Sequence, residues 1–359
     1  MKKIIILCNT YFQVLTAIQI KLKFYEKDKV IFLLSDHSKN TKLVAQKIEQ
    51  LNLFSRVCYL ETKNKYVDRN RSFTRKLFNL YSIIFGDNLL SADSTLDVDE
   101  LLFFNIDTYT YSLFASLYKF NRNLKCIKFE ESVISYNIPE VRGKMSLCGC
   151  FVRKYLLFKK NLLDSLNDFY CYSPELYQGK LNAIKIPKID CDELKTIIEN
   201  LFDINLSVYR YKYIFFTSVY DFDSICPIGE FEVLKQIRDF VGNDNLLVKV
   251  HPRDRRDVFI KEGFNLDPNN SVPWEAILIS ARITNCVLLS VNSSCLFASN
   301  IIENLNCVSA FVYPLCRVEN DPTAFITIKN IESLLNNELT RKWGKIKILE
   351  KLDDLLELK

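Results

Sequence analysis

Short apolar runs alternate with helical segments along most of this chain, and this alternation restricts the fold more than any other feature. Residues 4–8, 30–35 and 101–105 have the length and composition of buried strands, and a segment with helical apolar spacing follows each of them. Strands that alternate with helices form a parallel sheet with helices on both faces. The sequence therefore predicts an α/β protein.

The alternation occurs in two series. The first ends near residue 130, and the second opens at residues 213–216 and continues to residue 312. A chain of 359 residues is long enough for about two domains. We predict two Rossmann-like, doubly wound domains, residues 1–185 on the acceptor side and 186–359 on the nucleotide-donor side, facing a central cleft. This is the architecture of GT-B glycosyltransferases, although a fold alone does not fix chemistry.

Two helices are predicted late in the chain from their apolar spacing. One covers residues 295–303, and the other is a long, charged helix over residues 331–356.

The composition excludes several classes of protein. The net charge of +5 is too small to indicate nucleic-acid binding. A transmembrane helix needs a stretch of about 18 or more apolar residues, and the sequence has none. Twelve cysteines without an evident export signal favour reduced thiols in the cytoplasm. Cys148 and Cys150 stand one residue apart, and no second pair has zinc-ligand spacing. We therefore expect neither a metal nor a cofactor.

His251 is one of only two histidines, and it follows a buried strand at residues 247–250. Ligands of open α/β sheets bind at the carboxyl ends of the strands. Lys249 and Arg253 flank the histidine, and alternation along the strand would put Lys249 and His251 on one face. Such a group suits a phosphate or nucleotide leaving group. The alternative is a solvated strand end that leads into a charged turn.

A second polar group, Asn292-Ser293-Ser294, follows the next predicted strand, and Glu275 stands at a predicted helix start between the two groups. Hydroxyls and backbone N–H groups at a helix start can bind an anion, and a glutamate there could reach ribose hydroxyls. Ordinary helix capping is the alternative for both.

Glu130 and Glu131 end a predicted strand of the first domain at residues 125–130. A carboxylate at a strand end can act as general base on an acceptor hydroxyl, and an adjacent acid raises its pKa. An acidic surface loop is the alternative.

Taken in order, the acid pair, His251-Pro252 preceded by Lys249, and Ser293-Ser294 resemble the short motifs of bacterial sialyltransferases. The opening sequence CNTYFQV at residues 8–14 resembles the start of glycosyltransferase family 52, the lipooligosaccharide and capsular sialyltransferase group. The resemblance spans most of the chain. It departs from the family at Ser132, where those enzymes carry glycine after the acid pair.

The resemblance implies an inverting glycosyltransferase that moves sialic acid from CMP-sialic acid to a hydroxyl of a lipooligosaccharide or capsular oligosaccharide. Glu131, or else Glu130, would be the base, and His251 would assist the departure of CMP. Ser293 and Ser294 would hold the phosphate. The full set of expected donor-binding residues is Asn9, Thr217, Ser218, Lys249, Pro252, Arg253, Glu275, Ser293 and Ser294.

Asp221 is the reserve candidate for the base, because some family 52 enzymes place it in the loop after the first strand of the second domain. Asp221-Phe222-Asp223 also has the DxD spacing of a metal–nucleotide site. We expect cationic side chains and helix starts to take the place of a metal, so that the enzyme is metal-independent.

Two alternatives stay open. One is a GT-B transferase that uses a UDP-hexose or CDP-glycerol donor, and the other is a non-catalytic glycan-assembly protein, which Ser132 would favour. Residues 151–160 mix basic and bulky apolar residues, as in helices that lie on anionic membranes, although a core-facing helix with solvated lysines shows the same mixture. The expected location is cytoplasmic, with peripheral contact to the inner face of the cell membrane and a homodimer both left open.

Overall fold

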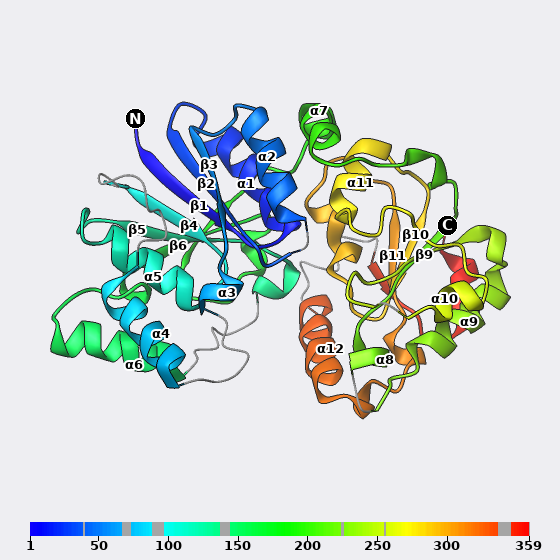
Figure 1. Ribbon diagram of the computed structural model, residues 1–359. Coiled ribbons are helices and arrows are strands. Elements are labelled where there is room, and N and C mark those ends of the chain that lie inside the picture. Colours follow the sequence, from blue (N-terminus) through cyan, green and yellow to red (C-terminus); the bar gives the residue numbers. More distant parts are fainter. Residues whose placement is uncertain are drawn as a thin grey trace. The chain divides into compact units, whose positions relative to one another are not determined.

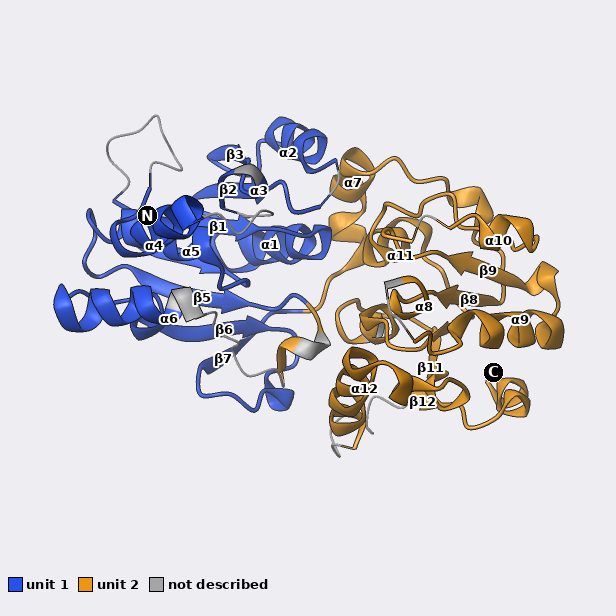
Figure 2. Ribbon diagram, turned by 60° about the horizontal axis from the view of Figure 1, so that its bottom comes forward, with its two compact units in different colours: residues 1–131, 138–187 blue, residues 132–137, 188–359 orange. Residues whose placement is uncertain are grey.

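The computed structural model (Figure 1) describes residues 1–38, 40–66, 73–87, 97–136, 144–223, 226–254, 256–336 and 346–358. The chain divides into two compact units. Unit 1 comprises residues 1–131 and 138–187, and unit 2 comprises residues 132–137 and 188–359 (Figure 2). Each unit contains one parallel sheet with helices around it, which confirms the predicted α/β class.

Unit 1 is built on a seven-stranded sheet in the order β3-β2-β1-β4-β5-β6-β7. Its strands are β1 (Lys3–Cys8), β2 (Lys29–Ser35), β3 (Arg56–Leu60), β4 (Glu100–Phe103), β5 (Lys125–Phe129), β6 (Leu166–Cys171) and β7 (Asn182–Lys185). Strand β1 pairs in parallel with β2 on one side and with β4 on the other. Because β1 has neighbours on both sides, its residues after Lys3 are buried, which explains its continuous apolar run.

The helices of unit 1 are α1 (Tyr11–Phe24), α2 (Thr41–Gln50), α3 (Lys63–Tyr66), α4 (Phe73–Phe85), α5 (Thr108–Leu117) and α6 (Lys144–Phe151), with the shorter turns η2 (Val152–Leu156, π-helical), η3 (Leu163–Ser165) and η4 (Pro174–Leu176). Figure 1 shows α4, α5 and α6 on one side of the sheet and α1 and α2 on the other. In the core beneath α4 and α5, Ile5 and Leu101 of the sheet pack with Ile83 and Phe114.

Unit 2 contains a five-stranded parallel sheet in the order β12-β11-β10-β8-β9. Its strands are β8 (Tyr213–Phe216), β9 (Leu246–Lys249), β10 (Val287–Ser290), β11 (Val308–Phe311) and β12 (Ile346–Ile348). Its α-helices are α7 (Cys191–Leu201), α8 (Tyr220–Asp223), α9 (Glu230–Val241), α10 (Val258–Lys261), α11 (Trp274–Ala281) and α12 (Pro322–Leu335). Its 3-10 turns are η1 (Val133–Tyr136), η5 (Leu206–Val208), η6 (Asn243–Asn245), η7 (Ser294–Asn300), η8 (Tyr313–Leu315), η9 (Val318–Asn320) and η10 (Leu352–Glu357).

The predictions of two helices late in the chain are wrong. Residues 331–356 do not form one helix, because α12 ends at Leu335 and β12 then pairs with β11 through Ile346 and Ser309. The sequence Ile346-Lys347-Ile348 alternates with the period of a strand, which the surrounding charged residues conceal. Residues 295–303 form no α-helix either: η7 is a 3-10 helix over Ser294–Asn300, in which Leu296, Phe297 and Ala298 are buried.

Residues 151–160, expected as a helix that either lies on a membrane or faces the core, do not form one continuous helix. Helix α6 ends at Phe151 and continues as the π-helical turn η2, and residues 157–160 are irregular. In the part of the chain that the structure describes, we find no helix that is both long and apolar enough to span a membrane.

Candidate functional site

Both sheets have a point where the strand order reverses. In unit 1 it lies between β1 and β4, and in unit 2 it lies between β8 and β10. Ligands of open α/β sheets bind outside the carboxyl ends of the strands at such a point. Asn9 and Thr10 follow β1, Thr217 follows β8, and Asn292 and Ser293 come shortly after β10. The predicted residues thus stand at the two sheet edges where ligands are expected.

The edge of unit 1 is organised by Gln13 in the first turn of α1. The Gln13 side chain is buried; its Oε1 accepts a hydrogen bond from the N–H of Asn9 (2.6 Å), and its Nε2 donates to Oδ1 of Asn105 (3.1 Å). Thr10 caps the helix, since its Oγ1 accepts from the N–H of Gln13 (3.3 Å). The amide therefore joins the loops after β1 and β4.

Asn9, predicted to bind the donor, is buried within unit 1. Its Oδ1 accepts hydrogen bonds from Oγ of Ser35 (2.7 Å) and from the hydroxyl of Tyr109. With its N–H also bonded to Gln13, the residue fixes the shape of the β1–α1 turn.

Glu131 stands two residues after β5 and is half-buried. Burial raises the pKa of its carboxyl, while hydrogen bonds with the side chains of Thr10 and Gln13 act in the opposite direction. The structure thus brings Glu131 to the start of α1. A carboxyl with a raised pKa, held in place by two polar side chains, suits a general base.

Glu130 lies in a different environment. Its side chain is buried, and its Oε2 accepts a hydrogen bond from the N–H of Tyr172 (2.8 Å) just beyond β6. Its own N–H donates to the carbonyl of Tyr170 (2.9 Å). Glu130 therefore ties the end of β5 to β6.

Ser132, which takes the place of the family glycine, begins a tight turn. Its N–H donates to Oγ of Ser135 (3.2 Å), and its carbonyl accepts from the N–H of Ser135 (2.9 Å), which starts the 3-10 turn η1. The backbone accommodates a side chain at this position.

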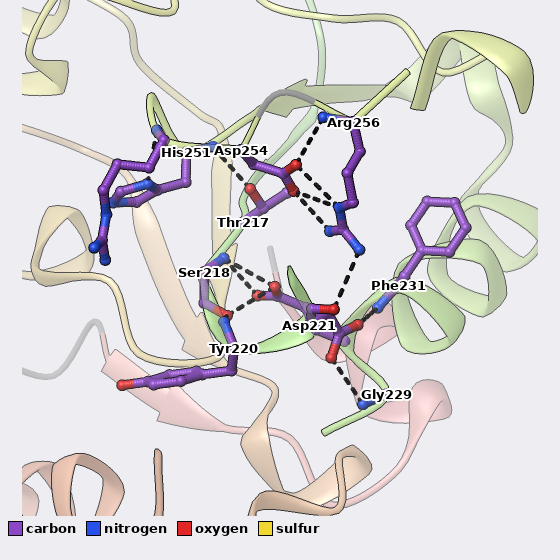
Figure 3. Close-up of polar contacts among 11 residues, drawn as sticks. Thr217, Ser218, Tyr220, Asp221, Gly229, Phe231, His251, Asp254 and Arg256 are labelled. Carbon is purple, nitrogen blue, oxygen red and sulfur yellow. Dashed lines mark hydrogen bonds and ion pairs between the residues drawn. The ribbon is translucent and has the colours of Figure 1, made fainter. Parts of the chain in front are cut away.

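His251 is fixed by its backbone at the end of β9. Its N–H donates to Oγ1 of Thr217 (2.8 Å), and its carbonyl accepts from the N–H of Asp254 (2.8 Å) (Figure 3). Its Nδ1 accepts from the N–H of Arg253 (3.2 Å). Because Nδ1 is an acceptor, the proton of the neutral imidazole is on Nε2, which can donate to a ligand. Pro252 and Arg253 are exposed beside it.

The loop after β8 is held by a buried carboxyl that the sequence did not single out. Glu230, at the start of α9, accepts hydrogen bonds from the N–H of Ser218 (2.9 Å) and from Oγ of Ser218 (2.8 Å). Burial raises the pKa of Glu230 to about 8, and the Ser218 hydrogen bonds and the charge of Arg256 counteract this only in part. Ser218, predicted to bind the donor, thus has its hydroxyl bonded within unit 2.

The raised pKa of Glu230 predicts a pH-dependent stability. Between the ordinary glutamate pKa of about 4.5 and the folded-state value of about 8, the folded protein binds a proton that the unfolded chain has released. The free energy of unfolding should therefore fall as the pH rises through this window. In Glu230→Gln this decrease should be reduced, which thermal unfolding from about pH 5 to about pH 9 would reveal. Glu232→Gln, an exposed glutamate of the same helix, is the control and should follow the wild type; identical curves for Glu230→Gln and wild type would contradict this account.

Asp221, the reserve base, caps α9. Its Oδ1 accepts from the N–H of Gly229 (3.0 Å), and its Oδ2 accepts from the N–H of Phe231 (2.8 Å). Nearby, Arg256 forms an ion pair with the buried Asp254 (2.6 Å) and reaches the carbonyl of Asp221 (Figure 3). Both carboxylate oxygens of Asp221 thus satisfy backbone donors. The second acid of the DxD sequence, Asp223, has a side chain outside the described part of the structure.

Lys249, predicted to contact the donor, is bound inside unit 2. Its Nζ lies 2.9 Å from Oδ2 of Asp267 and donates to the carbonyl of Asn269 (2.7 Å). The buried ammonium thereby fixes residues 267–269 against β9. Glu275 is also buried, and burial raises the pKa of its carboxyl while the charge of Lys249 lowers it.

The polar residues after β10 are linked to β8. Oγ of Ser290 donates to the carbonyl of Phe216 (2.8 Å) and accepts from the N–H groups of Asn292 and Ser293. Ser293 caps η7 through Cys295 (3.3 Å), and the half-buried Ser294 is the first residue of that turn. Because η7 is a short 3-10 turn, an anion here would be bound by hydroxyls and nearby N–H groups, without the macrodipole of a long helix.

Across the described ranges, no group of three or more histidine, cysteine, aspartate or glutamate side chains has the arrangement of a metal site. Three residues that organise these sheet edges were not predicted from the sequence: Gln13, Glu230 and Asp267. A buried glutamine in a first helical turn is a weak signal, and the partners of Glu230 and Asp267 are twelve or more residues away in the chain.

The sequence matches the alpha-2,8-polysialyltransferase family (POLYST) over residues 4–311, which is most of its length. The chain belongs to this family. The expectation of a bacterial sialyltransferase is therefore confirmed, and the protein is a sialyltransferase enzyme. A comparison with curated protein sequences finds no significant match.

Solved structures give the fold. The α/β-galactoside α-2,3-sialyltransferase of Photobacterium phosphoreum is similar with a TM-score of 0.51 at 10% identity, and the match covers 99% of this chain and 100% of that one. MurG of Acinetobacter baumannii gives a TM-score of 0.45 at 8% identity, covering 99% and 90%. The match to the Photobacterium enzyme, together with the two parallel sheets, confirms the predicted GT-B type of fold.

Proposed function

We propose that this sialyltransferase takes sialic acid from CMP-sialic acid and transfers it, with inversion and without a metal, to a hydroxyl of a surface glycan. The observation that carries the proposal is the edge of unit 2, where His251 follows β9 and Ser293 and Ser294 follow β10 on either side of β8. The carboxyl ends of β9 and β10 are separated by two strand spacings, which is about 10 Å. A nucleoside monophosphate can bridge such a distance.

In this proposal the leaving phosphate is stabilised by hydrogen bonds. The bond between the anomeric carbon and the phosphate oxygen breaks, and its electron pair stays on CMP. His251 donates from Nε2 to that phosphate, and the hydroxyls of Ser293 and Ser294 donate as well. Donors that are already fixed in the free enzyme stabilise a developing charge efficiently. The backbone bonds of His251 to Thr217 and Asp254 hold the ring in place.

We assign the general base to Glu131. It accepts the proton of the acceptor hydroxyl as the oxygen of that hydroxyl bonds to the anomeric carbon. Its raised pKa favours this role, and Gln13 and Thr10 orient it. Glu130 and Asp221 accept backbone hydrogen bonds, which suits them to positioning.

Family membership guides the rest of the proposal. We propose that the linkage is α-2,8 and that the acceptor is a sialylated chain of a capsule or lipooligosaccharide. The twelve cysteines favour a cytoplasmic location. Of the donor-binding residues predicted from the sequence, Pro252, Arg253 and Glu275 stay candidates for contacts with the nucleotide. We propose that the other four residues position the loops at the sheet edges through hydrogen bonds within their own units: Asn9, Thr217, Ser218 and Lys249.

A thermal-shift comparison of nucleotides tests the donor. CMP and CMP-sialic acid should raise the unfolding temperature of the protein, whereas UDP-glucose and CDP-glycerol should have little effect. Stabilisation by UDP-glucose alone would contradict the proposal and favour a UDP-hexose donor.

A further inference from the structure

Helix α4 of unit 1 carries an exposed apolar stripe. Phe73, Leu77, Tyr81 and Phe85 recur every four residues, and the side chain of Phe73 is 72% exposed. Residues at this spacing lie on one side of a helix. The opposite side of α4, with Asn79 and Ile83, is buried. The stripe is therefore additional to the face that packs in the core.

A second stripe continues from α6 into η2. Leu147, Phe151 and Tyr155 again recur every four residues, and Phe151 is 55% exposed. Leu156 and Phe158 follow, and Phe158 is 89% exposed. The rings of Phe151 and Tyr155 lie 5.0 Å apart, as do those of Tyr81 and Phe85 on α4.

The two stripes are neighbours, because α4 and α6 pack against each other (Figure 1). The helices approach closely at Gly149, where a Cβ atom would stand only 2.4 Å from Cγ2 of Ile83. We use the term α4–α6 face for the exposed residues Phe73, Leu77, Tyr81, Phe85, Leu147, Phe151, Tyr155, Leu156 and Phe158. Exposed apolar patches of this extent mark interaction surfaces.

The α4–α6 face rests on a fixed support. Arg153 of η2 is buried, and its guanidinium donates to the carbonyls of Ile84 and Lys160 and lies over the rings of Phe114 and Tyr118. This side chain joins η2 to the end of α4 and to α5. The exposure of the apolar residues is thus built into a packed structure.

The two segments that carry this face have basic side chains and no acidic ones, while Asp87 and Asp164, which follow them in the chain, form ion pairs with Lys65 and Lys154. Residues 73–86 and 144–160 contain no aspartate or glutamate, whereas they contain Lys76, Lys144, Lys154, Lys159 and Lys160 in addition to two arginines. An apolar surface bordered by cations matches the interface of an anionic membrane, into which the aromatic rings insert while the ammonium groups meet phosphates.

Phe158 adds a backbone argument. Its φ of 50° lies in the left-handed region, which a bulky side chain seldom adopts. Glycine would occupy this position without strain. A strained phenylalanine that buries almost nothing within the protein gains little for the fold, so its side chain points to an external contact.

We propose that the α4–α6 face docks this protein peripherally on an anionic phospholipid membrane. A second copy of the chain fits less well, since a symmetric contact would bring like charges of the two copies together. This docking requires neither donor nor acceptor, so it stands or fails separately from the proposed transfer reaction.

Co-sedimentation with vesicles tests the docking. The full-length protein should bind vesicles of phosphatidylethanolamine and phosphatidylglycerol, and added salt should weaken the binding. Phosphatidylcholine vesicles should bind much less, because each basic residue near an anionic surface is worth about fivefold. The triple variant Phe73→Ser/Phe151→Ser/Phe158→Ser should bind the anionic vesicles at least roughly tenfold more weakly, because it loses three large apolar side chains.

The matched control replaces exposed apolar residues of unit 2, in Ile260→Ser/Phe325→Ser/Ile326→Ser, and should bind like the wild type. Equal vesicle binding by the two triple variants would overturn the proposal. So would a wild-type protein that ignores vesicles and forms a dimer which the first triple variant disrupts, because the face would then be an interface between two copies.

The single variant Phe158→Gly separates docking from folding. Relief of the left-handed strain should keep the unfolding temperature at or above that of the wild type, while vesicle binding should fall several-fold. Unchanged vesicle binding by a stable Phe158→Gly protein would remove Phe158 from the docking surface and contradict the backbone argument.

Discussion

Glu131→Gln should lower kcat by roughly a hundred- to ten-thousandfold, the usual contribution of a general base. Glutamine keeps the size of the side chain and can still bond to Thr10 and Gln13, so the fold should persist. The base must be ionised, and burial raises the pKa of Glu131. Wild-type kcat/KM should therefore rise with pH through a value above the ordinary glutamate range, and Glu131→Gln should lose this acidic limb. Initial rates of CMP formation across a pH series measure both effects.

The same substitution at the other two acids distinguishes the candidates. Glu130→Gln changes a buried carboxyl that bonds to the backbone of Tyr172, and Asp221→Asn changes the cap of α9. Both substitutions should lower the unfolding temperature, whereas kcat should change little. A loss of turnover confined to Asp221→Asn, with Glu131→Gln active, would move the base to unit 2 and overturn our assignment.

His251→Ala should lower kcat by roughly a hundred- to a thousandfold, because the departing phosphate loses a fixed hydrogen-bond donor. The fold should survive, since the contacts of residue 251 with Thr217 and Asp254 are made by its backbone N–H and carbonyl. The unfolding temperature should therefore change little. Single-turnover measurement of CMP release isolates the chemical step.

The other histidine provides the matched control. His37 lies in unit 1 after β2, outside the proposed donor site, and His37→Ala should leave turnover nearly unchanged. Wild-type turnover in a folded His251→Ala protein would contradict the proposed role of the imidazole.

Local sequence patterns were sufficient to predict most strands of the two sheets. Strand β1 and helix α1 were predictable because a buried apolar run and a helical spacing are properties of adjacent residues. Strand β12 was missed because a three-residue edge strand is defined by its pairing with β11, which lies some 35 residues earlier. Turn η7 was mistaken for an α-helix because the apolar spacing of seven residues does not distinguish a 3-10 helix from an α-helix.

The site was predictable only to the level of strand ends. The positions of His251, Ser293 and Glu131 beyond β9, β10 and β5 follow from the strand pattern. Their partners do not, because Gln13 meets Asn105 across 92 residues and Lys249 meets Asp267 across 18. This is why Lys249 was expected to face the donor, whereas its ammonium is bound within unit 2.

The central claim is that the chain transfers sialic acid from CMP-sialic acid, and the most direct measurement is the rate of CMP release with and without an oligosialic acid acceptor. We predict CMP release that depends on the acceptor and produces a chain lengthened by α-2,8-linked sialic acid. Intact donor and unchanged acceptor after incubation with folded, nucleotide-binding protein would contradict the account.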